Sequence, residues 1–402
     1  MGEGESAGPL AGIRVLELGQ LIAGPFCGQL LADFGAEVVK IEPPGEGDAM
    51  RQWGKTDAQG NTVWWPVIAR NKKSVTLDLR SPDGQSIVRD LAAKADVLLE
   101  NFRPGTLERW GLGWEALSAI NPRLVMVRVS GYGQTGPYAG RAGFASVCEA
   151  MGGLRAIVGH PDRPPVRVGI SLGDSLAGVN AMLGTLLALR YRDVTGRGQV
   201  VDVSILESVL SMMESLIPEY DALGFVRQRT GSILPGLAPS NAYPTRDGRD
   251  VVIGANQDAV FRRLAEAMGQ PELAADERFA THQARGRNQD LLDGLVADWT
   301  RTLDAAAIVD RLAAAGVPAG LAYTAPDMLA DPHFRAREAI VRVPDARLGE
   351  IAMQGVFPRL VESPGAIRHA GPALGEHTAP VLAEWLGLDE AAIASLRERR
   401  IA

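Results

Sequence analysis

A strand–helix–strand alternation at the start of the chain limits its fold more than any other feature. Residues 13–18 (IRVLEL) are β-branched and leucine-rich, as expected of a buried strand. The stretch AGPFCGQLLADFGAE is amphipathic, with Pro25 near its first turn and Gly35 near its last, which is typical of a helix. A second apolar strand, EVVKIE, follows directly. This βαβ unit predicts a parallel sheet with helices on its faces.

The same alternation continues along the chain. A helix is predicted from Ser81 to Lys94, with Ser81 as its N-cap and Pro82 as its first residue. Further strands are predicted at SVTLDL, DVLLEN, RLVMVRVS and the start of VVDVSILESVL. The pattern predicts a doubly wound, Rossmann-like α/β fold, in which ligands bind beyond the carboxyl ends of the strands. Those ends carry Gln20, Glu42, Asn101, Phe102, Gly131 and Tyr132.

Chain length and a change of amino-acid composition near residue 225 predict two domains. A chain of 402 residues exceeds a typical single core. The segment RQRTGSILPGLAPSN is rich in Gly, Pro and Ser, as a domain crossing is. We expect a small α/β or α+β domain at 225–328. Strand-like runs return after Glu338, so residues 329–402 are expected to join residues 10–224 in the large domain. Helices are predicted in the small domain near 258–268, 287–302 and 304–315.

Composition and charge exclude several classes of protein. A net charge of −7 gives no basic footprint for nucleic acid. The two cysteines, Cys27 and Cys148, stand in apolar sequence, which argues against a disulfide framework and favours a reducing compartment. The five histidines are scattered and no CxxC occurs, so no metal site is predicted. No run approaches membrane-spanning length without charges. We therefore expect a cytoplasmic protein with no membrane partner.

The stretch from Val166 to Leu183 joins a valine-rich run to a long helical pattern, and Asp174 stands at the junction between Gly173 and Ser175. One interpretation makes Asp174 a helix cap, which Asp commonly is. The other makes it a carboxylate nucleophile kept ionised by the helix N-terminus. The apolar positions of this helix recur at three- and four-residue steps and predict its buried face; they are Leu176, Val179, Met182, Leu183, Leu186 and Leu187.

Other motifs are less specific. GYGQTG (131–136) matches the glycine pattern of a dinucleotide site, but Pro137 and Gly140 stand where the required helix should begin, so nicotinamide chemistry is disfavoured. The basic run RNKKS and Arg141 indicate either a solvated edge or a contact with a phosphorylated ligand. No GxSxG elbow supports a serine nucleophile.

Taken in order, the motifs RNKKSVTLDL, ENFRPG, SGYGQTGP, LGDSLAG and LGEHT resemble those of the class III CoA-transferases, the family that includes formyl-CoA transferase and the 2-methylacyl-CoA racemases. The resemblance spans nearly the whole chain. It implies an interlocked homodimer whose large domain is built from both termini, with acyl-CoA and carboxylic acids as substrates. It also implies that Asp174 is the catalytic residue. Candidate contacts with coenzyme A are Leu21, Ile22, Ala23, Lys72, Lys73, Asn101, Phe102 and Arg109, to which the charge pattern adds Arg141.

The resemblance implies a covalent route through an aspartyl anhydride and an aspartyl–CoA thioester. The backbone N–H groups of Gly173 or of the loop 131–136 are expected to stabilise the thioester oxygen. The loop at 230–240 and the dimer partner are expected to exclude water. For the substrate, the middle domain resembles that of members using succinyl-CoA and small dicarboxylic or hydroxy-acid acceptors. Long-chain, bile-acid and carnitine-type acceptors are the alternatives. An arginine at 227, 229 or 141 is a candidate for a distal carboxylate.

Two departures from the family pattern leave alternatives open. The tyrosine that covers the site of formyl-CoA transferase falls near Phe144, and the glycine-rich lid of that enzyme is missing, which disfavours formyl or oxalyl substrates. A racemase needs acid–base groups on both faces of the reacting carbon, yet Gly143-Phe144-Ala145-Ser146 replaces the racemase histidine segment. Transfer is therefore favoured over racemisation. A non-catalytic CoA-binding protein is the other alternative.

Overall fold

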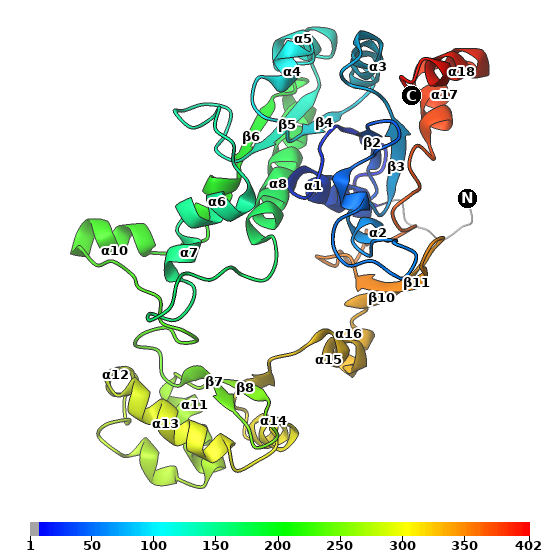
Figure 1. The fold of residues 1–402 in the computed structure, drawn as a ribbon. Helices are drawn as coiled ribbons and strands as arrows, with labels where there is room; N and C mark the ends of the chain where they lie inside the picture. Colours follow the sequence, from blue (N-terminus) through cyan, green and yellow to red (C-terminus); the bar gives the residue numbers. More distant parts are fainter. Residues whose placement is uncertain (1–7) are drawn as a thin grey trace. The chain divides into compact units, whose positions relative to one another are not determined.

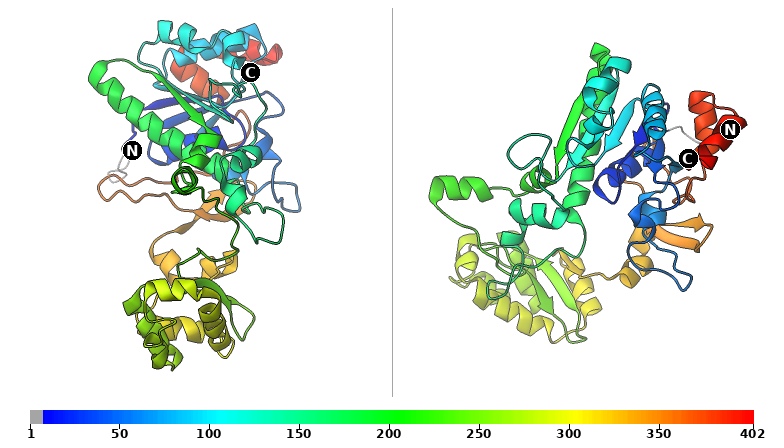
Figure 2. Two further views of the ribbon diagram at one scale, coloured as in Figure 1. Left: turned by 90° about the vertical axis from the view of Figure 1, so that its left-hand side faces the viewer. Right: turned by 45° about the horizontal axis from the view of Figure 1, so that its top comes forward.

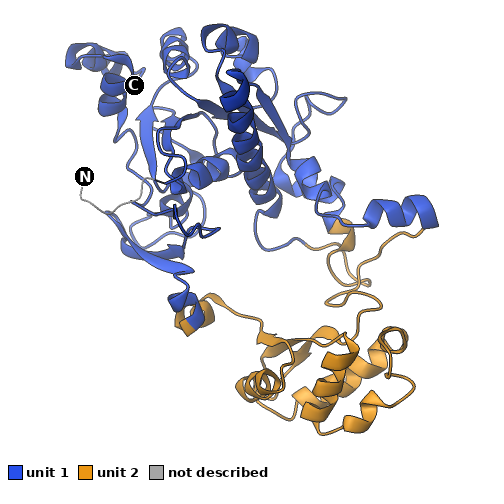
Figure 3. Ribbon diagram, turned by 180° about the vertical axis from the view of Figure 1, so that it is seen from behind, with its two compact units in different colours: residues 1–154, 167–224, 333–402 blue, residues 155–166, 225–332 orange. Residues whose placement is uncertain are grey.

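The computed structural model describes residues 8–402 (Figure 1). The chain divides into two compact units (Figure 3), a large unit of residues up to 154, 167–224 and 333–402, and a small unit of residues 155–166 and 225–332. The sequence predicted that the chain passes between the two domains near residues 225 and 328. The short segment 155–166, which belongs to the small unit, was not anticipated.

The large unit contains a six-stranded parallel sheet, so the prediction of a doubly wound α/β fold is confirmed. Its order is β3-β2-β1-β4-β5-β6, and every neighbouring pair runs parallel. The order reverses between β1 and β4, and ligands of such sheets bind at that switch point. The strands are β1 (Arg14–Glu17), β2 (Glu37–Glu42), β3 (Lys72–Thr76), β4 (Val97–Glu100), β5 (Val125–Ser130) and β6 (Val200–Ser204).

Side chains alternate across these strands and form a separate core on each face. On one face, Val15, Val38 and Val127 pack against α1 (Ala23–Asp33), α6 (Ala145–Met151), α8 (Leu172–Thr195) and α9 (Ile205–Leu210). On the other, Leu16, Val39 and Met126 pack against α3 (Pro82–Ala92), α5 (Trp114–Ile120), α17 (Thr378–Leu386) and α18 (Glu390–Glu398). Figure 2 shows these two helical layers. The predicted return of the C-terminal helices to the large domain is confirmed.

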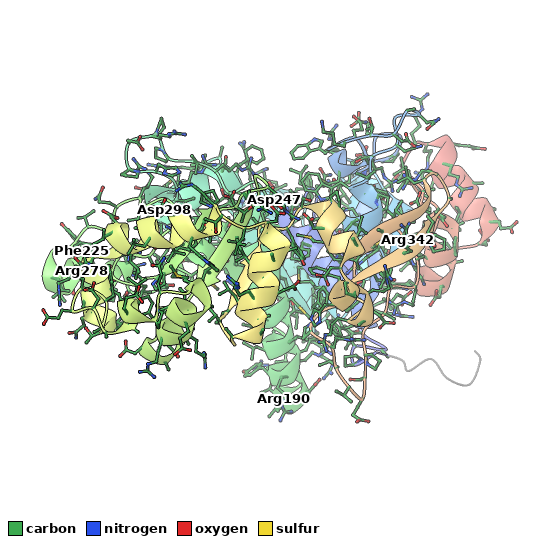
Figure 4. The ribbon with its side chains drawn as sticks, turned by 90° about the horizontal axis from the view of Figure 1, so that it is seen from below. Arg190, Phe225, Asp247, Arg278, Asp298 and Arg342 are labelled. Carbon is green, nitrogen blue, oxygen red and sulfur yellow. The ribbon has the colours of Figure 1, made fainter. Side chains whose placement is uncertain are left out.

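The prediction for the buried face of α8 was wrong. Val179, Leu183 and Leu187 are about half exposed, while the buried stripe consists of small residues that include Ala177, Gly178, Ala181 and Ala188. Small residues allow α8 to approach α1 closely: a Cβ atom added at Gly178 would lie 3.0 Å from the carbonyl oxygen of Ala23. Arg190, near the end of α8, is exposed (Figure 4).

By length and composition alone, α8 also suffices to cross a membrane, and it is the one such helix in residues 8–402. This finding does not contradict the expectation, which concerned runs without charges, because α8 contains Asp174, Arg190, Arg192 and Asp193.

The small unit is α+β. Its antiparallel sheet has the order β7-β8-β9, formed by Ser240–Pro244, Asp250–Gly254 and Ala319–Leu321. Helices α11 (Asp258–Met268), α12 (His282–Arg287), α13 (Gln289–Thr300) and α14 (Ala305–Ala314) share its core. Three of them, α11, α13 and α14, were predicted and are confirmed.

The remaining α-helices of the two units are short, and the last two strands form a hairpin. They are α2 (Trp65–Ile68), α4 (Thr106–Arg109), α7 (Leu154–Ile157), α10 (Leu216–Leu223), α15 (Ala325–Ala330) and α16 (Pro332–Ala336), with the hairpin of β10 (Ile340–Asp345) and β11 (Gly349–Gln354).

Candidate active site

A cavity of 270 Å³ lies at the carboxyl edge of the sheet, at the switch point between β1 and β4. All of its lining residues belong to the large unit. The segments that follow β1, β4 and β5 line it, together with the N-terminal parts of α6 and α8. Of the residues predicted for the site, the structure brings together Leu21, Ile22, Ala23, Asn101 and Asp174.

Asp174 is the third residue of α8 and lines the cavity. Ser171 occupies the N-cap position of this helix and its side chain makes no capping hydrogen bond, so the interpretation of Asp174 as the cap was wrong. The aspartate lies instead inside the first turn, where the helix dipole favours a negative charge. Asp174 therefore stands free to face a ligand in the cavity.

The pKa of Asp174 is raised to about 6, mainly by burial and then by the nearby Glu149 carboxylate, while Arg167 acts in the opposite direction. The carboxylate is more basic than an ordinary aspartate, yet it is ionised at pH 7. Basicity matters because a carboxylate with a higher pKa is a better nucleophile, provided that it remains deprotonated at the working pH.

Glu149, on α6, anchors the start of α8. Its Oε1 atom accepts a hydrogen bond of 3.0 Å from the backbone N–H of Gly173, and the side chain is buried. The N–H of Gly173 is therefore occupied. In the loop 131–136, Gly133 donates to Ser130 and Gln134 donates to Asp202. The N–H groups of Gly173, Gly133 and Gln134 were among those expected to stabilise the thioester oxygen, and all three already donate within the protein.

The start of α1 offers a different set of donors. Ile22 is the N-cap residue of α1, and Ile22 and Ala23 both line the cavity. The first N–H groups of a helix have no partner within the helix, and the dipole adds positive potential there. Within residues 8–402, no hydrogen bond from these two N–H groups to the protein is found. They can donate to an anionic oxygen in the cavity.

A buried network of charges fixes the loop between β1 and α1. Lys40 contacts Glu17 at 3.0 Å and Asp48 at 2.8 Å, and donates to the carbonyl of Gly19 at 2.7 Å. Asp48 accepts in turn from the backbone N–H of Leu21, which has a φ of 65°. A left-handed conformation is unfavourable for leucine. The network therefore holds Leu21 at the cavity in a conformation that it would not otherwise keep.

Lys72 and Lys73 do not lie at the cavity. Both stand at the amino end of β3, away from the carboxyl edge. The ammonium of Lys72 is fully buried, where it contacts Glu17 at 2.8 Å and the carbonyl of Pro25 at 2.6 Å. Lys73 pairs with Glu37. Because the Lys72 charge is fully buried and neutralised, Lys72 is not placed to hold a phosphate of CoA, and its assignment needs correction. The side chain of Lys73 is 34% exposed, and its assignment stays a prediction.

Asn101 acts on the loop that follows β1. Its side chain accepts from the backbone N–H of Gln20 and donates to the Gln20 carbonyl, both at 2.8 Å. A Cβ atom at Gly19 would lie 3.0 Å from Asn101 Oδ1, so a larger residue there would crowd this contact. Asn101 therefore positions the loop that carries Leu21 and Ile22.

A second cavity of 710 Å³ adjoins the same edge of the sheet. Phe102, the neighbour of Asn101, lines it and packs edge-to-face on Trp110 at 5.3 Å. Its lining includes three arginines, Arg80, Arg397 and Arg400.

Two predicted CoA contacts lie outside both cavities. Arg109 lines neither cavity; its guanidinium donates to Thr106. Arg141 also lines neither, and its guanidinium stacks 3.8 Å above the ring of Tyr138.

Several residues of the site were not predicted from the sequence. Arg167, Trp53 and Ser171 all line the first cavity, and Glu149 lies behind it. The signal for Arg167 was its place seven residues before Asp174 as the one cation between Val166 and Leu183. Glu149 gave no signal, because an isolated glutamate on a short helix is ordinary surface composition.

Other chemistries have little support at this site. The pKa of the Cys148 thiol is raised to about 11, mainly by burial and also by the negative charges of Asp174 and Glu149. The thiol is therefore protonated at neutral pH. It donates to the carbonyl of Gly131. The loop 131–136 is followed by turns and not by a helix, as the weak dinucleotide match indicated. Within residues 8–402, no cluster of His, Cys, Asp and Glu side chains suited to a metal ion is found.

Comparison with known proteins identifies the family. Residues 10–378 match the pattern of CoA-transferase family III. The chain is 60% identical to succinyl-CoA–D-citramalate CoA-transferase of Chloroflexus aurantiacus and 45% identical to the succinyl-CoA–L-malate CoA-transferase beta subunit of the same organism, over 98% of both chains in each case. A crystal structure of a CaiB/BaiF family protein from Brucella suis superimposes with a TM-score of 0.85 and 36% identity, covering 94% of this chain and all of that one. The chain belongs to CoA-transferase family III.

Proposed function

We propose that this chain transfers CoA from succinyl-CoA to a short dicarboxylic acid, with Asp174 as the covalent carrier. The observation that carries the proposal is the place of Asp174, an ionised carboxylate in the first turn of α8 on the cavity at the switch point. The names of two relatives pair succinyl-CoA with D-citramalate or L-malate, which are both hydroxylated dicarboxylates. These names support the choice of donor and of acceptor class.

The reaction divides into four acyl transfers. The Asp174 carboxylate attacks the thioester carbonyl of succinyl-CoA, and the C–S bond breaks to give a mixed anhydride and CoA thiolate. The thiolate attacks the aspartyl carbonyl, which releases succinate and leaves CoA on Asp174 as a thioester. The acceptor carboxylate then displaces this thiolate and forms a second anhydride. Finally the thiolate attacks the acceptor carbonyl, and Asp174 is restored.

Negative charge builds on the carbonyl oxygen at each attack. The N–H groups of Ile22 and Ala23 at the start of α1 are in place to donate to that oxygen, and the dipole of α1 adds to the stabilisation. The buried pairing of Lys40 with Asp48 holds this segment in position before the substrate arrives. Preorganised donors of this kind need no rearrangement during the reaction.

The second cavity is suited to the nucleotide end of CoA. Its arginines offer charge-assisted hydrogen bonds to phosphates, and Phe102 with Trp110 offers an aromatic surface for adenine. Asn101 and Phe102 are consecutive, and each lines one of the two cavities. A CoA thioester can therefore run along the carboxyl edge of the sheet, with its thioester carbonyl at Asp174.

The experiment is a mass-exchange assay on the purified full-length protein with succinyl-CoA and free malate or citramalate. New acyl-CoA of the acceptor mass is expected from the wild type, and Asp174→Asn and Asp174→Ala are expected to abolish it while CoA binding survives. Asp90→Asn, an exposed aspartate on α3, is the matched control and is expected to retain turnover. Hydroxylamine added during turnover is expected to label Asp174.

Other outcomes would contradict the proposal. Turnover that survives in Asp174→Asn would exclude the covalent role of the carboxylate. Solvent deuterium entering the α-carbon of the acyl group without exchange of acids would instead identify a racemase, and CoA binding with neither reaction would identify a binding protein.

A further inference from the structure

The charge on the lining of the first cavity is unusually simple. Of the side chains that line it, Asp174 and Arg167 alone carry a charge. Arg167 precedes α8 by five residues and is exposed. The cavity therefore presents one anion, at the reacting end, and one cation.

The guanidinium of Arg167 is largely uncommitted. Its one hydrogen bond in the described part of the chain is a long one of 3.5 Å from Nη2 to Ser171 Oγ, although an arginine has five N–H donors. No carboxylate within residues 8–402 forms an ion pair with it, Asp174 included. Arg167 is nevertheless close enough to lower the pKa of Asp174. A cation lining a cavity with free donors is suited to bind an anionic part of a ligand.

The arginines that the sequence suggested for this purpose are placed differently. Arg141 stacks on Tyr138 and does not line the cavity. Arg227 and Arg229 belong to the small unit, where Arg229 donates to the carbonyls of His160 and Arg163. Arg167 is therefore the arginine that shares a cavity with the nucleophile.

We propose that Arg167 determines the acid specificity by binding the distal carboxylate of a short dicarboxylic acyl group whose reacting carbonyl lies at Asp174. The proposal rests on the proposed function and narrows its substrate class. A planar guanidinium offers two parallel N–H donors that match a carboxylate. The cavity volume of 270 Å³ suits a short acyl chain and is too small to enclose a sterol or a long fatty acyl group.

Both halves of the reaction use this contact. Succinyl-CoA places its thioester carbon at Asp174, and the acceptor acid places one of its carboxylates there. Each of them carries a free carboxylate at its far end. The contact is therefore present in each ground state and each transition state, and its loss should lower kcat/KM for the dicarboxylate mainly through KM. An acyl group without the distal charge should be unaffected.

The test is a self-exchange assay, in which one acid serves as both donor and acceptor. Labelled succinate is exchanged into succinyl-CoA, and labelled monomethyl succinate, in which the distal charge is masked, is exchanged into its own thioester. The wild type is expected to prefer the succinyl pair by about 10- to 100-fold. Arg167→Gln is expected to abolish this preference by slowing succinyl exchange alone, and Arg167→Lys to retain part of it.

Matched controls separate the proposal from the function on which it rests. Arg123→Gln removes the same charge at the amino edge of the sheet, just before β5, and is expected to behave as the wild type. A wild type that exchanges neither pair would refute the proposed function itself. A wild type without preference, or an Arg167→Gln variant that slows both pairs equally while its melting temperature and CoA affinity are normal, would overturn the role of Arg167 alone.

Discussion

At the scale of single residues, the ionisation of Asp174 sets a testable limit on the reaction. Burial raises the pKa of this carboxylate to about 6, and only its ionised form can attack a thioester. Activity is therefore expected to be full above pH 7 and to be lost as the pH falls through 6. Below that value kcat/KM should fall about tenfold per pH unit. The measurement is a pH–rate profile of the free enzyme with succinyl-CoA below its KM.

Glu149 provides the matched variant for that profile. Glu149→Gln keeps an oxygen that can accept from the N–H of Gly173, yet removes the negative charge that helps to raise the pKa of Asp174. The acid limb of the profile is expected to move to lower pH. An unchanged limb, or one that moves to higher pH, would contradict the account of how Asp174 is tuned.

The sequence placed Asp174 at the candidate site because its signal is local: Gly173-Asp174-Ser175 at the start of a helical pattern places the side chain beside a helix N-terminus. Lys72 shows the limit of such reasoning. A run of basic residues indicates exposure, but Lys72 is neutralised by Glu17, which lies 55 residues away in the chain. Ion pairs between residues so far apart in the chain depend on which strands are neighbours in the sheet. A single sequence does not reveal which residues such neighbours bring together.

At the scale of elements, the contact between α1 and α8 fixes the floor of the site. A methyl group at Gly178 would lie 2.8 Å from the Phe26 ring and 3.0 Å from the Ala23 carbonyl. Gly178→Ala gains about 1 kcal/mol of helix propensity but forces the helices apart at a cost of about 1–3 kcal/mol. We expect a net loss of stability and of activity, since Ala23 lines the cavity. Urea unfolding and kcat/KM measure the two effects.

Gly294 is the control for this substitution. It lies inside α13, and an added Cβ atom would meet nothing within 4 Å. Gly294→Ala should therefore show the propensity alone and stabilise by about 0.5–1 kcal/mol. If Gly178→Ala stabilised as much as Gly294→Ala does, the close approach of α1 and α8 would not constrain the site.

The elements themselves were predicted well where strands and helices alternate. Ser81 caps α3 as expected, through a hydrogen bond from the N–H of Asp83. The orientation of α8 was predicted wrongly because apolar periodicity was assumed to identify the inner face. In α8 the inner face needs small residues, since α1 lies so close, and the large apolar residues Leu183 and Leu187 point outward. Periodicity identifies an apolar face but not what covers it.

At the scale of the whole molecule, the outward face of α8 needs a partner. Val179, Leu183, Leu187, Tyr191 and Val194 are between 48% and 68% exposed and follow one another at three- and four-residue steps, which makes a continuous apolar stripe. Monomeric proteins seldom leave such a stripe in water. Because closed symmetric dimers are the commonest oligomers, and because the family resemblance implies one, we propose that a second copy of the chain covers it.

The stripe gives the proposed dimer a sharp test. Leu183→Glu would bury a charge against apolar side chains, a cost of several kcal/mol that a partner surface cannot offset. Light scattering at micromolar concentration should give twice the chain mass for the wild type and a lower mass for this variant. Ile120→Glu, at an exposed apolar residue on α5, should leave the mass unchanged. A monomeric wild type would refute self-association. A relative is named as the beta subunit of its enzyme, so such a result would direct the search to a different chain as the partner.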